Sequence, residues 1–375
     1  MIIDSHVYCF TPVDQPGGYA SAAERMRWVQ MATAGHQQHA FRIRDRRPSD
    51  SKVLAPLGKD LHGPLPDLNF RVDHDQGRTI WTIDGEDHTK YWFPPNLRNV
   101  EYTPHSLISE MDYAGVDVAL LHTDPALGRD SAYLADCCKQ YPERIYSMAP
   151  VDQWRIVNEP AAVIEELTTA INTHGLHAIK IIPPLGYLSS DEPWDDGPYR
   201  AFWEAATSLN VPVFFTLGWD SKKSDYTTES SGLEGYLQQL RILMRWMDRY
   251  PNTVCSLTHG FPWFELMQGD RIVLPDEIWE PFKNPNCNLE VCMPVRLGDL
   301  YDYPYRGCWP AMEAMLEHIG AGQLLWGTDM PFQNRFCTYR QSRDWIEKYC
   351  TFITEQDMAL LMGGTCARIL GIPTS

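Results

Sequence analysis

The chain has no long apolar run and no run of positive charge. None of its hydrophobic stretches reaches the roughly 18 residues that a transmembrane helix requires, and its first residues lack the pattern of a secretory signal. Its Lys and Arg residues form no stretch that could follow a phosphate backbone, and 49 acidic against 32 basic side chains give a formal charge of -17. These absences predict a cytoplasmic protein without membrane or nucleic-acid partners.

Two kinds of short motif are missing as well. The ten cysteines include no CxxC pair, and Cys255, Cys287 and Cys292 lie in apolar runs where a free thiol packs like a small hydrophobic group. We therefore expect reduced, structural cysteines. No GxGxxG or P-loop string is present to favour a nucleotide-binding open sheet.

Strand-like and helix-like segments alternate regularly along the chain. Eight apolar, β-branched runs predict strands at 1–7, 118–121, 145–150, 178–182, 211–215, 253–257, 287–292 and 324–327. Helical periodicity between most of these runs predicts helices at 131–141, 160–174, 199–208, 232–250 and 308–319. Eight such units over about 250 residues match a closed (β/α)8 TIM barrel better than an open doubly wound sheet.

One segment interrupts this alternation after the first strand. Residues 9–105 are far longer than the two to six residues, roughly, of a βα loop. Within them, residues 79–92 predict a β-hairpin around an Asp84-Gly85 turn, and residues 20–34 predict a helix. Because βα loops leave the barrel at the face that carries active sites, we expect this insertion to lie over the active site as a cap, or between subunits.

The predicted elements divide the chain into two parts. Residues 1–8 and 106–375 are predicted to form the barrel, and residues 9–105 the inserted cap.

Residues with acid–base chemistry lie where the predicted strands end. Asp4, His6 and Tyr8 occupy alternate positions of the first strand, so their side chains share one face. Three further strand ends carry Thr216, His259 and Asp329. Because the C-terminal ends of barrel strands surround a single site, we expect these side chains to lie together.

The strings around these residues resemble the amidohydrolase superfamily. Within it they resemble the amidohydrolase-related branch that includes aminocarboxymuconate semialdehyde decarboxylase and γ-resorcylate decarboxylase. That family usually reads Asp-x-His-x-His on the first strand, Pro-Val-x-x-His on the fifth, His-Gly-Gly after the sixth and Gly-Ser/Thr-Asp-x-Pro on the eighth. The chain keeps His6, His259 and the string Gly327-Thr-Asp-Met-Pro331.

The resemblance covers residues 1–8 and about 100–372, and leaves the insertion unexplained. It implies a barrel enzyme of the hydrolase or carboxy-lyase type, active in the catabolism of aromatic compounds and assembled as a homodimer. The chain departs from the family pattern at two metal positions, where Tyr8 and Thr216 replace histidine.

These two replacements bear on metal binding. Zinc and manganese sites need about three or more imidazole or carboxylate ligands from the protein. Asp4, His6 and Asp329 could form a three-ligand site if the acid-x-His pattern is moved back by two residues. We predict either no cofactor or one divalent ion (Zn or Mn), and favour none.

Without a metal, Asp329, His259 and His6 still form an acid–base set. Asp329 can accept a proton from water, and His259 can donate to a developing oxyanion. We therefore predict hydrolysis of a small cyclic or aromatic carboxylated compound, such as a lactone or a ring-cleavage product. Two alternatives stay open, a metal-assisted decarboxylase of an aromatic or muconate-type acid and a catalytically silent binding barrel. His6 and Asp329 could also serve only as hydrogen-bonding groups at the barrel mouth.

Other residues near the strand ends predict substrate contacts. A cation suits a substrate carboxylate, and Lys180 lies in the predicted fourth strand while Arg129 and Arg335 follow the second and eighth. Arg335 could instead pair with the abundant acidic residues of the surface. The remaining predicted contacts are Tyr8, Thr216 and Trp219.

Overall fold

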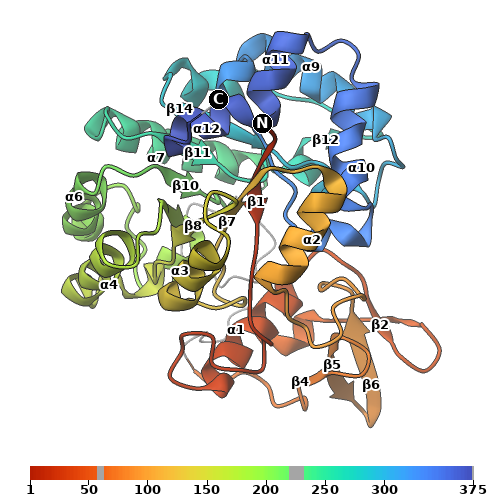
Figure 1. Ribbon diagram of the computed structural model, residues 1–375. Coiled ribbons are helices and arrows are strands. Elements are labelled where there is room, and N and C mark those ends of the chain that lie inside the picture. The colour runs from red at the N-terminus through yellow and green to blue at the C-terminus, as the bar shows by residue number, and fades with distance from the viewer. Residues whose placement is uncertain (57–62, 219–231, 374–375) are drawn as a thin grey trace.

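The computed structural model describes residues 1–56, 63–218 and 232–373, and its centre is an eight-stranded parallel sheet (Figure 1). In sheet order the strands are β1 (Ile3–Val7), β7 (Val118–Leu121), β8 (Ile145–Ala149), β9 (Ala178–Ile181), β10 (Val213–Phe215), β11 (Cys255–Leu257), β14 (Cys287–Val291) and β15 (Leu324–Trp326). The first and last strands meet where the Tyr8 amide donates to the Met330 carbonyl at 2.8 Å. The sheet therefore closes as a TIM barrel, and the eight predicted strands are confirmed.

Helices surround this barrel (Figure 1). All five predicted helices are present, as α3 (Ser131–Gln140), α4 (Pro160–Asn172), α6 (Arg200–Ser208), α7 (Leu233–Arg249) and α9 (Trp309–His318). Further α-helices in the described part of the chain are α2 (Pro104–Ala114), α5 (Pro183–Gly186), α8 (Pro294–Leu297), α10 (Tyr339–Asp344), α11 (Glu355–Ala359) and α12 (Thr365–Leu370). No helix in the described part of the chain is long and apolar enough to cross a membrane.

Local sequence signals set the ends of helix α2, which returns the chain from the insertion to the barrel. The Thr103 side chain accepts a hydrogen bond from the Ser106 amide, and Pro104 occupies the first helical position. Gly115 ends the helix with a φ of 72°, a left-handed conformation that glycine adopts without steric cost. These caps fix the direction in which the chain enters β7.

The inserted segment contains helix α1 (Ala22–Gly35) and an antiparallel five-stranded sheet in the order β3-β2-β6-β5-β4. Its strands are β2 (Ala40–Arg42), β3 (Pro48–Ser49), β4 (Arg71–Asp73), β5 (Arg78–Ile83) and β6 (Glu86–Lys90). The predicted helix is confirmed, and so is the hairpin, since Ile83 pairs with Glu86 across the Asp84-Gly85 turn. Sequence patterns missed β2, β3 and β4 because two or three residues show no clear alternation. The segment lies at the end of the barrel toward which β1 runs (Figure 1).

The barrel interior buries ionisable side chains as well as apolar ones. His6 and Glu290 are fully buried, and Lys180 is 2% exposed. The interior of such a barrel is usually filled by branched apolar residues, and a buried charge costs free energy unless it is paired. The buried charges therefore mark the part of the barrel where function is expected.

Candidate functional site

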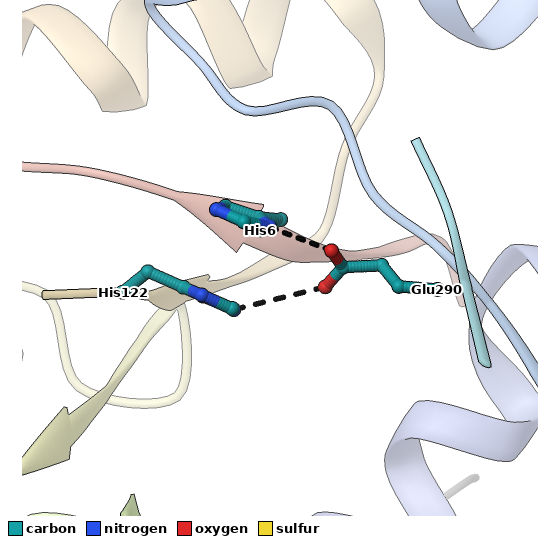
Figure 2. Close-up of side chains that lie close together, drawn as sticks. All are labelled: His6, His122 and Glu290. Atoms are coloured by element: carbon teal, nitrogen blue, oxygen red, sulfur yellow. Dashed lines mark hydrogen bonds and ion pairs between the residues drawn. The ribbon is translucent and has the colours of Figure 1, made fainter. Parts of the chain in front are cut away.

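His6, on β1, is engaged through both ring nitrogens. Its Nδ1 lies 2.6 Å from Oε2 of Glu290 on β14, and its Nε2 lies 2.9 Å from the Tyr8 hydroxyl. The same Nε2 is 3.2 Å from Oδ1 of Asp329. Figure 2 shows the Glu290 carboxylate directed at both His6 and His122. These contacts fix the orientation of the His6 ring.

Asp329 and His259 lie at strand ends in an unusual backbone conformation. Their φ angles are 65° and 63°, in the left-handed region that residues other than glycine seldom adopt. The Asp329 amide donates to the His6 carbonyl at 2.7 Å, and the His259 amide donates to Glu290 Oε2 at 2.8 Å. These bonds hold both turns and place His259 Nε2 3.5 Å from Asp329 Oδ1. Such strain is typical of functional positions.

The protonation states of this pair follow from its surroundings. Burial raises the pKa of the Asp329 carboxyl, but the hydrogen bond from His259 and the electrostatic interactions with the two imidazoles and Arg335 together outweigh it, and the pKa lies below its usual value. Burial, followed by the proximity of His6, lowers the pKa of His259 to about 4. At neutral pH Asp329 is therefore an ionised acceptor beside a neutral imidazole.

The two oxygens of the Asp4 carboxylate accept four hydrogen bonds within the protein. Its Oδ1 accepts from the amides of His6 at 3.0 Å and Thr328 at 3.1 Å, while Oδ2 accepts from the Thr328 hydroxyl at 2.5 Å and the Tyr339 hydroxyl at 2.6 Å. Burial raises its pKa to about 7. Asp4 thus ties β1 to the turn that carries Asp329, and the structure does not bring its oxygens into a group of candidate metal ligands.

One set of ligand atoms fits a single divalent ion. The ligand atoms of His6, His259 and Asp329 lie within 4.8 Å of one another, and two imidazoles with a carboxylate are suitable donors for zinc or manganese. The Glu290 carboxylate bonds to His6 Nδ1 and so orients the ring, as a carboxylate commonly does for a metal-binding histidine. The Tyr8 hydroxyl, however, competes for the lone pair of His6 Nε2.

A second set, His6, His122 and Glu290, is satisfied by its own hydrogen bonds. His122 Nε2 lies 2.8 Å from the Ser5 carbonyl, which can only accept, so this nitrogen carries the hydrogen. The His122 ring stacks on His6 with centroids 3.6 Å apart. We interpret Glu290 and His122 as residues that hold the His6 ring in its orientation.

A cavity of about 290 Å³ opens beside Asp329. The barrel contributes to its wall Tyr8, Thr216, Thr258, His259, Arg296 and Phe332, among others. The inserted segment contributes Ala32, Gly35, His36 and Trp92. The cavity is therefore lined by both polar and aromatic side chains, which suits a small ring compound.

The three basic residues that were predicted to contact the substrate lie at different places relative to the cavity. Arg335 donates to the Trp92 carbonyl at 2.7 Å and contacts His36 Nε2 at 3.2 Å, close to the cavity wall. Lys180 is buried behind Thr258, with its Nζ 3.2 Å from the Thr258 hydroxyl. Arg129 pairs with Asp152 and Glu166 and is not brought into the cavity. Trp219 lies outside the described residues.

Glu290 and Arg296 are among the residues of this site that sequence patterns did not identify. Glu290 is the one charged residue of the fully buried strand β14, a signal that could have identified it. Arg296, on the short helix α8, lines the cavity and makes no side-chain hydrogen bond or ion pair within the described part of the chain. Nothing in its local sequence distinguishes it from a surface arginine.

Solved structures with this fold include enzymes that act on ring acids. A dihydroxybenzoic acid decarboxylase from Polaromonas sp. JS666, with bound manganese and the inhibitor 2-nitroresorcinol, is 18% identical, covers 75% of this chain and 90% of its own, and has a TM-score of 0.53. A Pseudomonas putida protein provisionally named 2-pyrone-4,6-dicarboxylic acid hydrolase is 15% identical, with coverages of 76% and 91% and a TM-score of 0.54.

A third structure, an apo protein from Agrobacterium tumefaciens, matches 100% of this chain and 97% of its own at 13% identity, with a TM-score of 0.53. At these identities the likeness shows the fold alone.

No curated protein matches the sequence. The family model described as "Amidohydrolase" matches residues 60–372. Because that match spans most of the chain, the protein belongs to the amidohydrolase family, whose members are expected to be hydrolases or carboxy-lyases.

Proposed function

We propose that this protein hydrolyses a small cyclic carboxylated compound, such as a lactone, with Asp329 as the base that activates water. The observation that carries this proposal is the position of the Asp329 carboxylate. It lines the 290 Å³ cavity, its pKa is lowered, and it lies 3.2 Å from His6 Nε2 and 3.5 Å from His259 Nε2. A general base must be ionised, oriented and within reach of water, and this carboxylate meets these conditions.

The reaction requires Asp329 to accept one proton from water and later to donate it to the leaving oxygen. Asp329 takes a proton from water while the water oxygen bonds to the carbonyl carbon of the substrate. The ring C–O bond then breaks with its electron pair on the leaving oxygen, and Asp329 returns the proton to that oxygen. A carboxylate only accepts, so the neutral His259 ring carries its hydrogen on Nε2 and orients Asp329. His259 Nδ1, buried without a partner among the described residues, can accept from water or substrate.

The charges around the cavity support a carboxylated substrate. Arg296 lines it without a side-chain partner in the described ranges, and a guanidinium binds a carboxylate through paired hydrogen bonds. Trp92 and Phe332, whose rings are parallel within 8° at 6.2 Å, lie in the same wall. We propose that the inserted segment acts as a cap that supplies this aromatic surface.

Two assay compounds test the reaction. The purified protein is incubated with 2-pyrone-4,6-dicarboxylate and with 2,6-dihydroxybenzoate, while ring absorbance and carbon dioxide are followed. Loss of the pyrone ring without release of carbon dioxide is the expected result. Release of carbon dioxide from either acid would contradict hydrolysis.

Metal-assisted decarboxylation is the second candidate, because His6, His259 and Asp329 form a suitable donor set. A bound ion would act as a Lewis acid that holds and polarises the substrate. In that case Asp329 would serve as a ligand, and the activation of water proposed above would not apply.

We expect activity to persist after exhaustive dialysis against a chelator. The Tyr8 hydroxyl lies 2.9 Å from His6 Nε2 and Thr216 stands at the fifth-strand position, so the chain offers fewer strong ligands than its family pattern. Turnover and metal content are measured before and after dialysis. Loss of turnover that zinc or manganese restores would contradict this expectation and favour decarboxylation.

Replacing Arg296 with Met should raise KM by about 10-fold and leave kcat nearly unchanged, because the guanidinium would bind ground state and transition state alike. The measurement is steady-state kinetics on the hydrolysed compound. An analogue without the carboxylate serves as the control, since its KM should not change. Equal effects on both compounds would show that Arg296 does not recognise the carboxylate.

A further inference from the structure

Three polar side chains form a row that ends at the cavity. Lys180, on β9, lies with Nζ 3.2 Å from the hydroxyl oxygen of Thr258, which follows β11. That oxygen lies 2.6 Å from the hydroxyl oxygen of Thr216, which follows β10. Thr216 and Thr258 line the cavity, whereas Lys180 is buried one step behind them.

The contacts of His122 show which group donates in the hydrogen bonds of Lys180. Its Nε2 donates to the Ser5 carbonyl, so its Nδ1 can only accept, and it does so from Lys180 Nζ at 3.1 Å. Lys180 is therefore a donor toward His122 and toward Thr258. An ammonium group has no acceptor, so Thr258 must accept from it.

The hydroxyl hydrogen of Thr258 then has two acceptors within reach. These are the Phe215 carbonyl at 3.2 Å and the Thr216 hydroxyl at 2.6 Å. If Thr258 donates to Phe215, Thr216 donates back to Thr258 and presents only lone pairs to the cavity. If Thr258 donates to Thr216, the hydrogen of Thr216 is free to donate into the cavity. An anionic oxygen in the cavity can only accept, so it selects the second arrangement.

We propose that Thr216 donates to the oxyanion that forms when water attacks the substrate carbonyl, and that Lys180 strengthens this bond through Thr258. The proposal rests on the hydrolysis proposed above. No proton is transferred along the row; the proton from water goes to Asp329. The positive charge polarises successive hydrogen bonds, which strengthen one another in a buried site. Thr216 touches the reacting oxygen, and Lys180 and Thr258 are positioning residues.

Four variants test the row. Thr216→Val keeps the shape and removes the donor, and should lower kcat about 100-fold with KM changed by less than about threefold, as for loss of one oxyanion donor. Thr216→Ser keeps the hydroxyl and should retain most of the activity. Lys180→Met and Thr258→Val should each lower kcat about 10-fold, because the donor remains without its polarising partners. Thr168→Val, on helix α4 and away from the cavity, is the matched control and should not change kcat.

A double variant tests whether Thr216 and Lys180 act as a unit or contribute independently to kcat. If the three residues act as a unit, Thr216→Val combined with Lys180→Met should be no slower than Thr216→Val alone. If the loss of kcat in the double variant equals the product of the losses in Thr216→Val and Lys180→Met, the residues act independently and the connected row is wrong. A normal kcat in Thr216→Val would show that Thr216 is not the donor. Thr258→Val makes the same comparison if Lys180→Met does not fold.

A binding measurement makes the test independent of turnover. The probe is 3-carboxyphenylboronic acid, whose hydroxide adduct is a tetrahedral anion, and its affinity is measured by calorimetry. Wild type and Thr216→Ser should bind it about 10-fold more tightly than Thr216→Val, the ratio expected for one good hydrogen bond to an anion. Equal affinities, including no binding by any of them, would overturn the proposal. Hydrolysis that survives in Asp329→Asn would overturn the proposed function instead, and this affinity ratio would be unaffected.

Discussion

Asp329→Asn should slow the chemical step by at least the roughly 100-fold that is typical of losing a general base. The amide keeps the size of the carboxylate and can still bond to the neighbouring imidazoles, but it cannot accept a proton from water. Substrate binding should be largely retained, so the loss appears in kcat. Single-turnover kinetics on the hydrolysed compound measure it directly.

The matched comparison is His259→Asn, which should also lower turnover because the neutral ring that orients Asp329 is lost. The folded fraction of each variant is checked by circular dichroism. Near wild-type single-turnover rates in well-folded Asp329→Asn protein would contradict the mechanism. A catalytically silent barrel would show no turnover with any compound, and a purely structural Asp329 would show lost stability without a specific loss of rate.

Asp4→Ala should lower the free energy of unfolding by about 3–5 kcal/mol, since four buried donors from His6, Thr328 and Tyr339 lose their acceptor. Asp4→Asn should be milder, because its amide group can still bond to the two hydroxyl oxygens. Chemical denaturation of the three proteins measures the effect.

This comparison also separates a structural Asp4 from a metal-binding one. If Asp4 ties β1 to the Asp329 turn, both variants change stability and leave any bound metal at its wild-type stoichiometry. A drop in metal content with unchanged stability would show that Asp4 is a ligand instead.

The barrel could be predicted from the sequence because each of its elements carries its own local pattern. Strands such as Val118–Leu121 and Ala178–Ile181 are short apolar runs, and helices such as Pro160–Asn172 combine a proline start with helical periodicity. Alternation of the two then restricts the topology to a parallel sheet. The hairpin of the insertion was predictable for the same reason, since an Asp-Gly turn is a local signal.

The candidate site was only partly predictable. The strand-end rule identified His6, His259 and Asp329 as neighbours, because a closed barrel gathers strand ends at one face. It could not show which oxygen or nitrogen of each side chain faces which partner. The structure assigns the Asp4 oxygens to Thr328 and Tyr339, a choice that depends on side-chain rotamers in the folded barrel.

The sequence by itself thus determined the strands, the main helices, the barrel class and the candidate acid–base residues, because these follow from local periodicity and from strand ends. Only the tertiary structure decided the partners of Glu290, the position of Arg296 in the cavity wall and the row from Lys180 to Thr216. The physical reason is that a hydrogen bond depends on distances of a few tenths of an ångström between residues far apart in the chain, and no local pattern encodes such distances.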